Sequence, residues 1–309
     1  MNIIFVHTID LRNRSKLMKN TPLKRHTITS LVLFLFFPFV SLANSATNTA
    51  YRVKTIVIDA GHGGQDGATR GLFSREKDVA LKVALRLGRT IEDNLKDVKV
   101  VYTRTTDEFV KLYERIEIAN RAKADLFISI HCNDMPVISH TVISGYRKTK
   151  NKKRTPVYTT TRTKSTSTRG VETFVSGFGR LDEQDIAMRE NASILLEKDY
   201  KENYAGYDPN DPESIIVLSL MKNAFRDQSI KFATMIQNEY VKTGRIDRGV
   251  QEKSLAVLAR ASMPAVLTEI GFISNPEEEN YINSEKGQNE IVSCILNAIK
   301  TYKKQVEQE

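Results

Sequence analysis

Cysteine and tryptophan are scarce in this chain of 309 residues, which has two cysteines and no tryptophan. Cys132 and Cys294 form no CxxC pair, so the sequence offers no thiolate metal motif and no framework of several disulfides. One disulfide between them would be compatible with an oxidising compartment, and the sequence does not decide it. Hydrophobic residues nevertheless make up 40% of the chain. This composition excludes a disordered chain and a membrane bundle, and it favours a globular protein with a substantial core.

Acidic residues are absent from one long segment, and this absence shapes the charge of the whole chain. The net charge is +9, but residues 1–43 carry six Lys/Arg against one Asp, and residues 135–171 carry nine Lys/Arg and no acid. Without these two segments the chain is mildly acidic. No aromatic RNA-binding motif and no zinc-finger spacing accompanies the basic segment. The charge therefore does not indicate nucleic-acid binding, and we expect none.

Residues 1–43 have the pattern of a secretory signal peptide. A basic stretch that includes Lys24 and Arg25 precedes an apolar stretch at residues 28–40, and a small-x-small site follows at residues 41–43. The apolar stretch is too short for a stable membrane-spanning helix, although an uncleaved anchor is the alternative. Translation from Met18 would give a leader of more usual length. We expect export to the periplasm, cleavage without a lasting membrane anchor, a linker at residues 44–52, and a catalytic domain at residues 53–309.

Strand and helix patterns alternate through the expected domain, which is typical of an α/β fold. The expected strands are short apolar runs, and the expected helices repeat an apolar residue every three or four positions. Strands are predicted at 54–59, 99–103, 126–130, 171–175 and 265–270, and helices at 76–96, 112–124, 214–244 and 291–306. The pattern predicts a three-layer fold, in which a twisted, mostly parallel sheet is covered by helices on both faces.

Two segments interrupt this alternation. Residues 135–170 are basic and rich in Thr and Ser, without an apolar period, and we expect a solvated loop there. Its role is either none, as a lineage-specific insertion, or attraction to anionic polymers of the cell envelope. Residues 199–213 are aromatic, acidic and interrupted by proline, and they belong to a wider interval at residues 179–213.

Histidine is scarce as well, and its placement points to a metal. Of the five histidines, two lie in the leader and His140 lies in the basic segment. The other two, His62 and His131, stand at the ends of predicted strands, as Glu269 does. Ligands of an open parallel sheet bind beyond the carboxyl ends of its strands. Two imidazoles with a carboxylate form a catalytic zinc site that keeps one position open for water.

The spacing alone leaves the carboxylate ligand open. Glu76 begins the first predicted helix after a glycine-rich loop, so its carboxylate can face the strand ends. Glu269 could be either a ligand or the catalytic base. Glu172 and Glu190 are weaker candidates. For each histidine, the alternative is a core residue bonded to the backbone.

Five ordered blocks of the sequence are similar to one enzyme family. Residues 56–68 read IVIDAGHGGQDGA and are followed by EKD at 76–78, then by TRTTD at 103–107 and LYER at 112–115. Residues 119–131 read ANRAKADLFISIH, and LAVL at 255–258, PAVLTEIGFISN at 264–275 and EEE at 277–279 complete the set. Together they resemble the zinc-dependent N-acetylmuramoyl-L-alanine amidases of the amidase type 3 family. The resemblance covers about residues 54–303 apart from the basic segment.

This resemblance implies a zinc site at the carboxyl edge of the strands and a reaction. His62, Glu76 and His131 map onto the three ligands of one Zn²⁺, and Glu269 maps onto the catalytic glutamate. The substrate would be peptidoglycan, cut between N-acetylmuramic acid and L-alanine during wall remodelling or daughter-cell separation. We expect Asp66, Arg104 and Arg115 to support this site rather than react. Cys132 follows a ligand on a strand, and its side chain should face the other way.

Regulation is also implied by the resemblance. Some relatives are held inactive by an inserted helical segment that lays a carboxylate on the zinc until an activator protein of the cell envelope withdraws it. The matching interval here is residues 179–213, where Glu183 and Glu190 are the candidate inhibitory groups. The alternative is an acidic surface segment without a gating role.

Two other functions compete with the amidase. A zinc carboxypeptidase acting on wall peptides would need an arginine that binds a substrate carboxylate, and none stands out in the sequence. A catalytically inactive peptidoglycan-binding protein should have lost a ligand or Glu269, and the sequence keeps all four residues.

Overall fold

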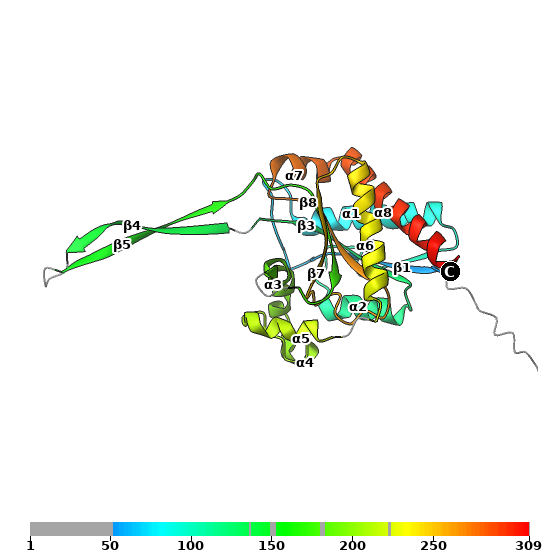
Figure 1. Cartoon of the computed structure of the whole chain (residues 1–309), viewed down its shortest axis with the longest axis horizontal. Coiled ribbons are helices and arrows are strands. Elements are labelled where there is room, and N and C mark those ends of the chain that lie inside the picture. The colour runs from blue at the N-terminus through cyan, green and yellow to red at the C-terminus, as the bar shows by residue number, and fades with distance from the viewer. Residues whose placement is uncertain (1–51, 136, 149–152, 180–182, 222–223, 309) are drawn as a thin grey trace, which may run out of the picture. The chain divides into compact units, whose positions relative to one another are not determined.

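A six-stranded sheet organises the domain (Figure 1). The computed structural model describes residues 52–308 except 136, 149–152, 180–182 and 222–223, and the described residues belong to one compact unit. The strands lie in the order β2-β1-β3-β8-β6-β7. Their bounds are β1 Thr55–Ala60, β2 Lys99–Tyr102, β3 Leu126–Asn133, β6 Val171–Ser176, β7 Asp247–Lys253 and β8 Ala265–Phe272.

Most neighbouring strands of the sheet are parallel. β1 pairs in parallel with β2 and β3, β3 with β8, and β6 with β7, whereas β6 runs antiparallel to β8. β3 and β8 are buried along their whole length, because helices cover both faces of the sheet. The predicted mostly parallel sheet is confirmed.

Helices form a layer on each face of the sheet. The first layer packs on one apolar core and comprises α1 Glu76–Asn94, α6 Arg226–Lys242, α7 Pro276–Asn283 and α8 Glu285–Val306. The second core lies on the other face, under α2 Leu112–Arg121 and the shorter helices α3 Asp185–Asn191, η2 Ala192–Leu196, α4 Tyr200–Asn203, η3 Pro212–Ser214 and α5 Ile215–Ser219. The predicted three-layer fold is therefore confirmed. In the part of the chain that the structure describes, no helix combines the length and apolar character needed to cross a bilayer.

The helix predicted at residues 214–244 is wrong as a single element. The structure has η3, α5 and then α6, which begins at Arg226 after a break. Apolar residues continue across this break, so periodicity alone joined two helices that pack on opposite faces of the sheet. β7 was not predicted, because Asp247–Lys253 is polar and lies at the edge of the sheet.

The basic segment is more regular than the expected loop. β4 Val137–Lys148 and β5 Arg154–Lys164 pair as an antiparallel hairpin. Threonine, valine, isoleucine and tyrosine favour strands, and the two strands satisfy each other's backbone hydrogen bonds without a core. The expectation of an irregular loop is therefore wrong, while the role of the segment is a separate question.

The remaining sequence predictions divide between described and undescribed residues. Cys132 and Cys294 are both free and buried, so the disulfide is not formed in this structure. The predicted leader, and the predicted linker up to residue 51, lie outside the described residues.

Candidate metal centre and active site

A sharp turn after β1 carries His62 into the site. His62 adopts a φ of 58°, and Gly63 and Gly64 follow with φ values of 127° and 58°. Residues other than glycine rarely adopt a positive φ. The three consecutive positive φ values therefore need support from contacts outside the turn. A Cβ on Gly63 would lie 2.3 Å from the carbonyl oxygen of Glu108, which leaves no room for a side chain there.

Two buried arginines hold this turn by its carbonyl groups. Arg104 donates from Nε to the Ala60 carbonyl (2.8 Å) and from Nη2 to the Gly61 carbonyl (2.7 Å). Arg115 donates from Nη2 to the His62 carbonyl (2.7 Å) and from Nη1 to Asp59 (2.8 Å). Their donors are therefore used to fix the backbone that presents His62, as expected for supporting residues.

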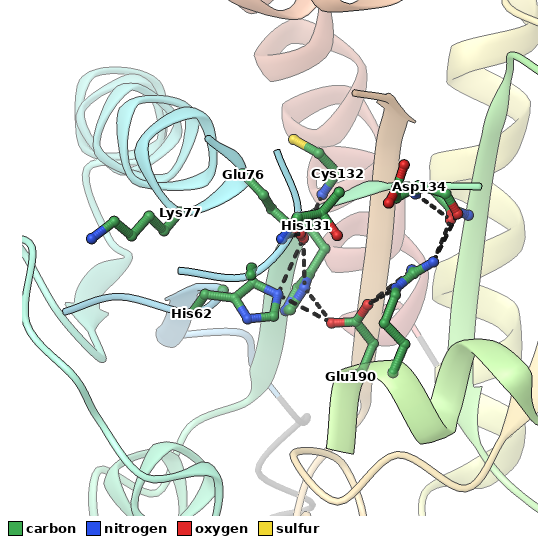
Figure 2. A network of polar contacts seen from close by, with 12 residues as sticks. His62, Glu76, Lys77, His131, Cys132, Asp134 and Glu190 are labelled. Atoms are coloured by element: carbon green, nitrogen blue, oxygen red, sulfur yellow. Dashed lines mark hydrogen bonds and ion pairs between the residues drawn. The ribbon is translucent and has the colours of Figure 1, made fainter. Parts of the chain in front are cut away.

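Four side chains converge at the carboxyl edge of the sheet, as Figure 2 shows. His62 follows β1, His131 lies in β3, Glu76 begins α1 and Glu190 lies in α3. One potential ligand atom from each lies within 4.8 Å of the others, and all four residues are buried. The sequence resemblance indicated the first three as ligands, and the structure adds Glu190 from the interval at residues 179–213.

The contacts within this cluster are short. Glu76 Oε1 lies 3.2 Å from His62 Nε2 and 3.1 Å from His131 Nδ1. Glu190 Oε2 lies 3.2 Å from His62 Nε2 and 2.9 Å from His131 Nδ1. Two carboxylates and two imidazoles therefore point their ligand atoms at one small volume.

The donor set fits a metal ion. His62 Nε2 and Glu190 Oε2 are buried and make no hydrogen bond of good geometry, although they lie at ion-pair distance. Buried polar atoms are normally satisfied, so such atoms call for a further partner. Neutral imidazole nitrogen and carboxylate oxygen are both zinc ligands. The cluster can therefore hold a divalent cation.

Electrostatics within the cluster make the histidines cationic and the carboxylates anionic. Burial opposes charge on His131, but Glu190 and Glu76 raise its pKa to about 9. Burial likewise opposes charge on Glu76, whereas the two histidines lower its pKa to about 2. A metal ion would take the place of the protons on the imidazoles, so its binding releases protons.

Asp66 supports His62 from the side away from the cluster. Its Oδ2 lies 2.9 Å from His62 Nδ1, and the carboxylate is buried. A carboxylate on one ring nitrogen fixes the tautomer that leaves the other nitrogen, here Nε2, ready for a metal. This contact agrees with the supporting role expected of Asp66.

Glu269 lies beside the cluster at the centre of the sheet. Its position in β8 pairs with His131 in β3, and its side chain is fully buried. Burial first, and then the negative charge of Glu190, raise the pKa of Glu269 well above its ordinary value. Its Oε2 makes no hydrogen bond, and Arg189 Nη2 lies 3.5 Å from its Oε1. A buried carboxyl group with a raised pKa can accept and release a proton near neutral pH.

Comparison with known proteins assigns the chain to a family. The family described as N-acetylmuramoyl-L-alanine amidase matches residues 56–301. The chain belongs to this family. Curated relatives include AmiC of Escherichia coli O6:H1, which is 29% identical over 253 residues, and AmiA of Escherichia coli K12, which is 26% identical over 254 residues. Each alignment covers 81% of this chain. It covers 53% of AmiC and 76% of AmiA, so the chain spans about half the length of AmiC.

A solved structure supports the same assignment. An N-acetylmuramoyl-L-alanine amidase of Clostridium difficile 630 is 26% identical, with a TM-score of 0.54. The match covers 82% of this chain and 97% of that one. The fold of that amidase is therefore shared over most of its length, while the hairpin β4–β5 lies outside the blocks that carry the sequence resemblance.

A cavity lies against the cluster of His62, Glu76, His131 and Glu190. A space of about 380 Å³ is lined by His62, Asp66, Thr69 and Glu190 among others. A second space of about 520 Å³ is lined by Asn133, Glu172, Asp185, Arg248 and Phe272 among others. Arg189 lines both spaces, and it was not singled out from the sequence.

Arg189 connects the candidate regulatory segment to the catalytic edge. It donates from Nε to Glu190 Oε1 (2.9 Å) and from Nη1 to the carbonyl of Asp134 (2.9 Å), in addition to its contact with Glu269. Its position directly before Glu190 was the one signal available in the sequence. The arginine ties α3 to the ends of β3 and β8.

Other sequence candidates lie away from the cluster. The side chain of Glu183 is exposed, so Glu190 is the residue of this pair that lies among the histidines. Glu172 is buried beside Arg248 and lines the second cavity. The thiol of Cys132 lies in the apolar core and points away from the cluster in Figure 2, while its backbone N–H donates to Glu76 (3.0 Å).

Proposed function

We propose that this chain hydrolyses the amide bond between N-acetylmuramic acid and L-alanine in peptidoglycan, with one zinc ion held by His62, Glu76 and His131. The observation that carries the proposal is the convergence of two buried histidines, a buried glutamate and the fully buried Glu269 at one sheet edge. Family membership supports the choice of bond, and the donor set supports zinc. Bound zinc would polarise the scissile carbonyl and acidify water at neutral pH.

Glu269 is proposed as the group that moves the proton. It takes a proton from the attacking water and then delivers it to the departing nitrogen of L-alanine, because an amide nitrogen leaves poorly without protonation. The burial that raises its pKa favours the protonated form, which is the form needed for the second transfer. Loss of the Glu190 charge from its side would make the ionised form easier to reach.

The proposed catalytic centre is held rigidly by its surroundings. Asp66 fixes the tautomer of His62, and Arg104 and Arg115 fix the backbone of the same turn. Glu76 also accepts from the backbone N–H of Cys132, which joins α1 to β3. Such support keeps the ligands in place before substrate binds.

We further propose that Glu190 inhibits the enzyme when no partner protein is bound. Its Oε2 lies 3.2 Å from His62 Nε2 and 2.9 Å from His131 Nδ1, in the volume where water and the substrate carbonyl must approach. An envelope protein that draws α3 outward would remove Glu190 and open the site. The contacts of Arg189 with Asn133, Asp134 and Glu269 would have to break in the same movement.

The expected compartment is the periplasm. The leader pattern at residues 1–43 supports export, and peptidoglycan is the substrate that the family description implies. Within the envelope, the enzyme would serve wall remodelling or the separation of daughter cells.

Metal content tests the centre directly. The purified protein should hold one zinc per chain, and a His62→Ala, His131→Ala double variant should hold none. Chelation should abolish hydrolysis while circular dichroism keeps the signal of the sheet, because the two apolar cores do not depend on the metal. His140→Ala, on the exposed hairpin, is the matched control and should retain zinc. Stoichiometric zinc in the double variant would overturn the ligand assignment.

A further inference from the structure

The hairpin β4–β5 forms a two-stranded sheet of its own, apart from the six-stranded sheet (Figure 1). β4 begins at Val137, four residues after β3 ends at Asn133, and neither of its strands joins the six-stranded sheet. A two-stranded hairpin that packs on nothing else is only marginally stable. Contact with a partner would therefore stabilise this hairpin.

Apolar side chains gather on one face of the hairpin near its turn. Ile143 pairs with Tyr158 across the strands, and Tyr146 pairs with Pro156, so these residues share a face. Ile143 is 50% exposed, Tyr146 60% and Tyr158 62%. On the opposite face Val142 is 57% exposed. Such side chains lose contact with water only when they enter another apolar medium.

Positive charges lie between this apolar group and the turn. Lys148 pairs directly with Arg154, and Arg147 lies beside them, all three exposed. Like charges directly opposite each other destabilise a strand pair, so the fold of the free hairpin gives no reason for this arrangement. The sequence has no acidic residue between 135 and 171 to compensate them. A negatively charged surface would relieve the repulsion.

We propose that the described part of the hairpin at residues 143–148 and 154–158, called the tip below, binds the surface of an anionic phospholipid bilayer. Tyrosine with flanking lysine and arginine is the composition that settles at the headgroup level of membranes, with aliphatic groups reaching the acyl boundary. The basic charge complements an anionic headgroup layer. β4 has 12 residues, so the hairpin holds the tip about 40 Å along its length from the end of β3.

Two other kinds of partner fit the tip less well. Peptidoglycan offers carboxylates and hydroxyl groups but no apolar layer for Ile143 and Val142. Protein interfaces are enriched in tyrosine and arginine but depleted of lysine, so Lys148 is the tip residue that fits a protein partner least well. This inference does not depend on the proposed hydrolysis.

The absence of tryptophan gives a direct probe of the tip. The protein from residue 44 onward is used, because the apolar stretch of the leader would bind vesicles by itself. Tyr146→Trp introduces the only tryptophan in the chain, and Val241→Trp on α6 is the matched control at a position that is 46% exposed. We expect a blue shift of the Trp emission with phosphatidylglycerol-containing vesicles for the Tyr146 variant alone. Phosphatidylcholine vesicles should give little shift, and salt should weaken the effect.

Variants separate the charge from the apolar group. A triple variant removes the three cations of the tip: Arg147→Gln, Lys148→Gln, Arg154→Gln. Its vesicle binding should weaken on the order of a hundredfold, at about fivefold per cation. The control triple variant removes the same number of exposed cations from the domain: Lys82→Gln, Arg89→Gln, Arg260→Gln. It should bind vesicles as the unchanged protein does. Ile143→Ser with Tyr158→Ser should also lose binding while hydrolysis of soluble muropeptides is unchanged.

Three outcomes would overturn the inference. The first is an unshifted Trp emission with anionic vesicles, and the second is equal binding of the hairpin and domain charge variants. The third is binding to purified sacculi, but not to vesicles, that the hairpin variants lose, which would assign the tip to the wall polymer. None of these outcomes depends on whether the chain hydrolyses muropeptides.

Discussion

At the scale of single residues, Glu269 combines full burial with an unpaired oxygen. It stands opposite His131 in the sheet, and Arg189 Nη2 lies 3.5 Å from its Oε1. Burying a carboxyl group with an oxygen that makes no hydrogen bond costs stability, and such costly groups are typical of functional sites. The burial and the raised pKa together support the proposal that Glu269 transfers the proton.

Replacing Glu269 by Gln should remove the reaction but keep the site. The amide preserves size and hydrogen-bonding shape, so zinc content and binding to sacculi should stay at the level of the unchanged protein. Turnover should fall by about 10²–10⁴, which is the usual contribution of general acid–base catalysis. Glu277→Gln, at a side chain that is 82% exposed, is the control. Near-normal turnover of the Glu269 variant would assign the base to another residue.

Asp59 should make stability dependent on pH in the acid range. Burial opposes its charge, but Arg115, Ser129 and Thr103 lower its pKa below the ordinary 3.8. Because the folded pKa is lower than the unfolded one, the stabilisation is complete above about pH 4 and is lost as pH falls through the folded pKa. Urea unfolding of the metal-free protein across pH 2 to 7 measures this slope.

The variant Asp59→Asn should lose that acid slope and leave Arg115 buried without its partner. The expected cost at neutral pH is about 3–5 kcal/mol, as for other broken buried ion pairs. Asp227→Asn, at a side chain that is 89% exposed, should change neither quantity. An unaltered acid slope in the Asp59 variant would show that another group carries it.

At the scale of elements, the sequence predicted the strands whose burial restricts their residues mostly to apolar types. β1, β3 and β8 are mostly apolar and almost entirely buried because both faces are covered. His62 follows β1, His131 lies in β3 and Glu269 lies in β8. The hairpin was not predicted, because strands without a buried face lack the period that identifies them. The sequence did not show whether Glu183 or Glu190 faces the histidines, because this depends on how α3 is oriented against the sheet.

Glu190 should restrain the isolated enzyme. Glu190→Ala removes the carboxylate from the metal cluster, so hydrolysis of soluble muropeptides should rise several-fold if entry of water limits the rate. Glu183→Ala is the matched control in the same segment, and its exposed side chain should leave activity unchanged. Equal activity of the two variants, both folded and zinc-loaded, would mean that α3 has no gating role.

At the scale of the whole molecule, the site depends on contacts between distant parts of the chain. Glu279, at the start of the last helical region, accepts from the backbone N–H groups of Leu72, Phe73 and Ser74 at 2.8–3.0 Å. These residues lead directly into Glu76. The C-terminal part of the domain therefore positions the segment that leads to Glu76, the proposed ligand from the N-terminal part, and sequence spacing alone could not show this link.

The hydrolysed bond is the central claim, and mass spectrometry of purified sacculi treated with the zinc-loaded protein tests it most directly. The account predicts released stem peptides with a new L-alanine N-terminus, together with glycan strands that keep the lactyl group of muramic acid. The Glu269→Gln variant should release neither product above background. Stem peptides shortened at their C-termini and still attached to glycan would contradict the account and identify a carboxypeptidase.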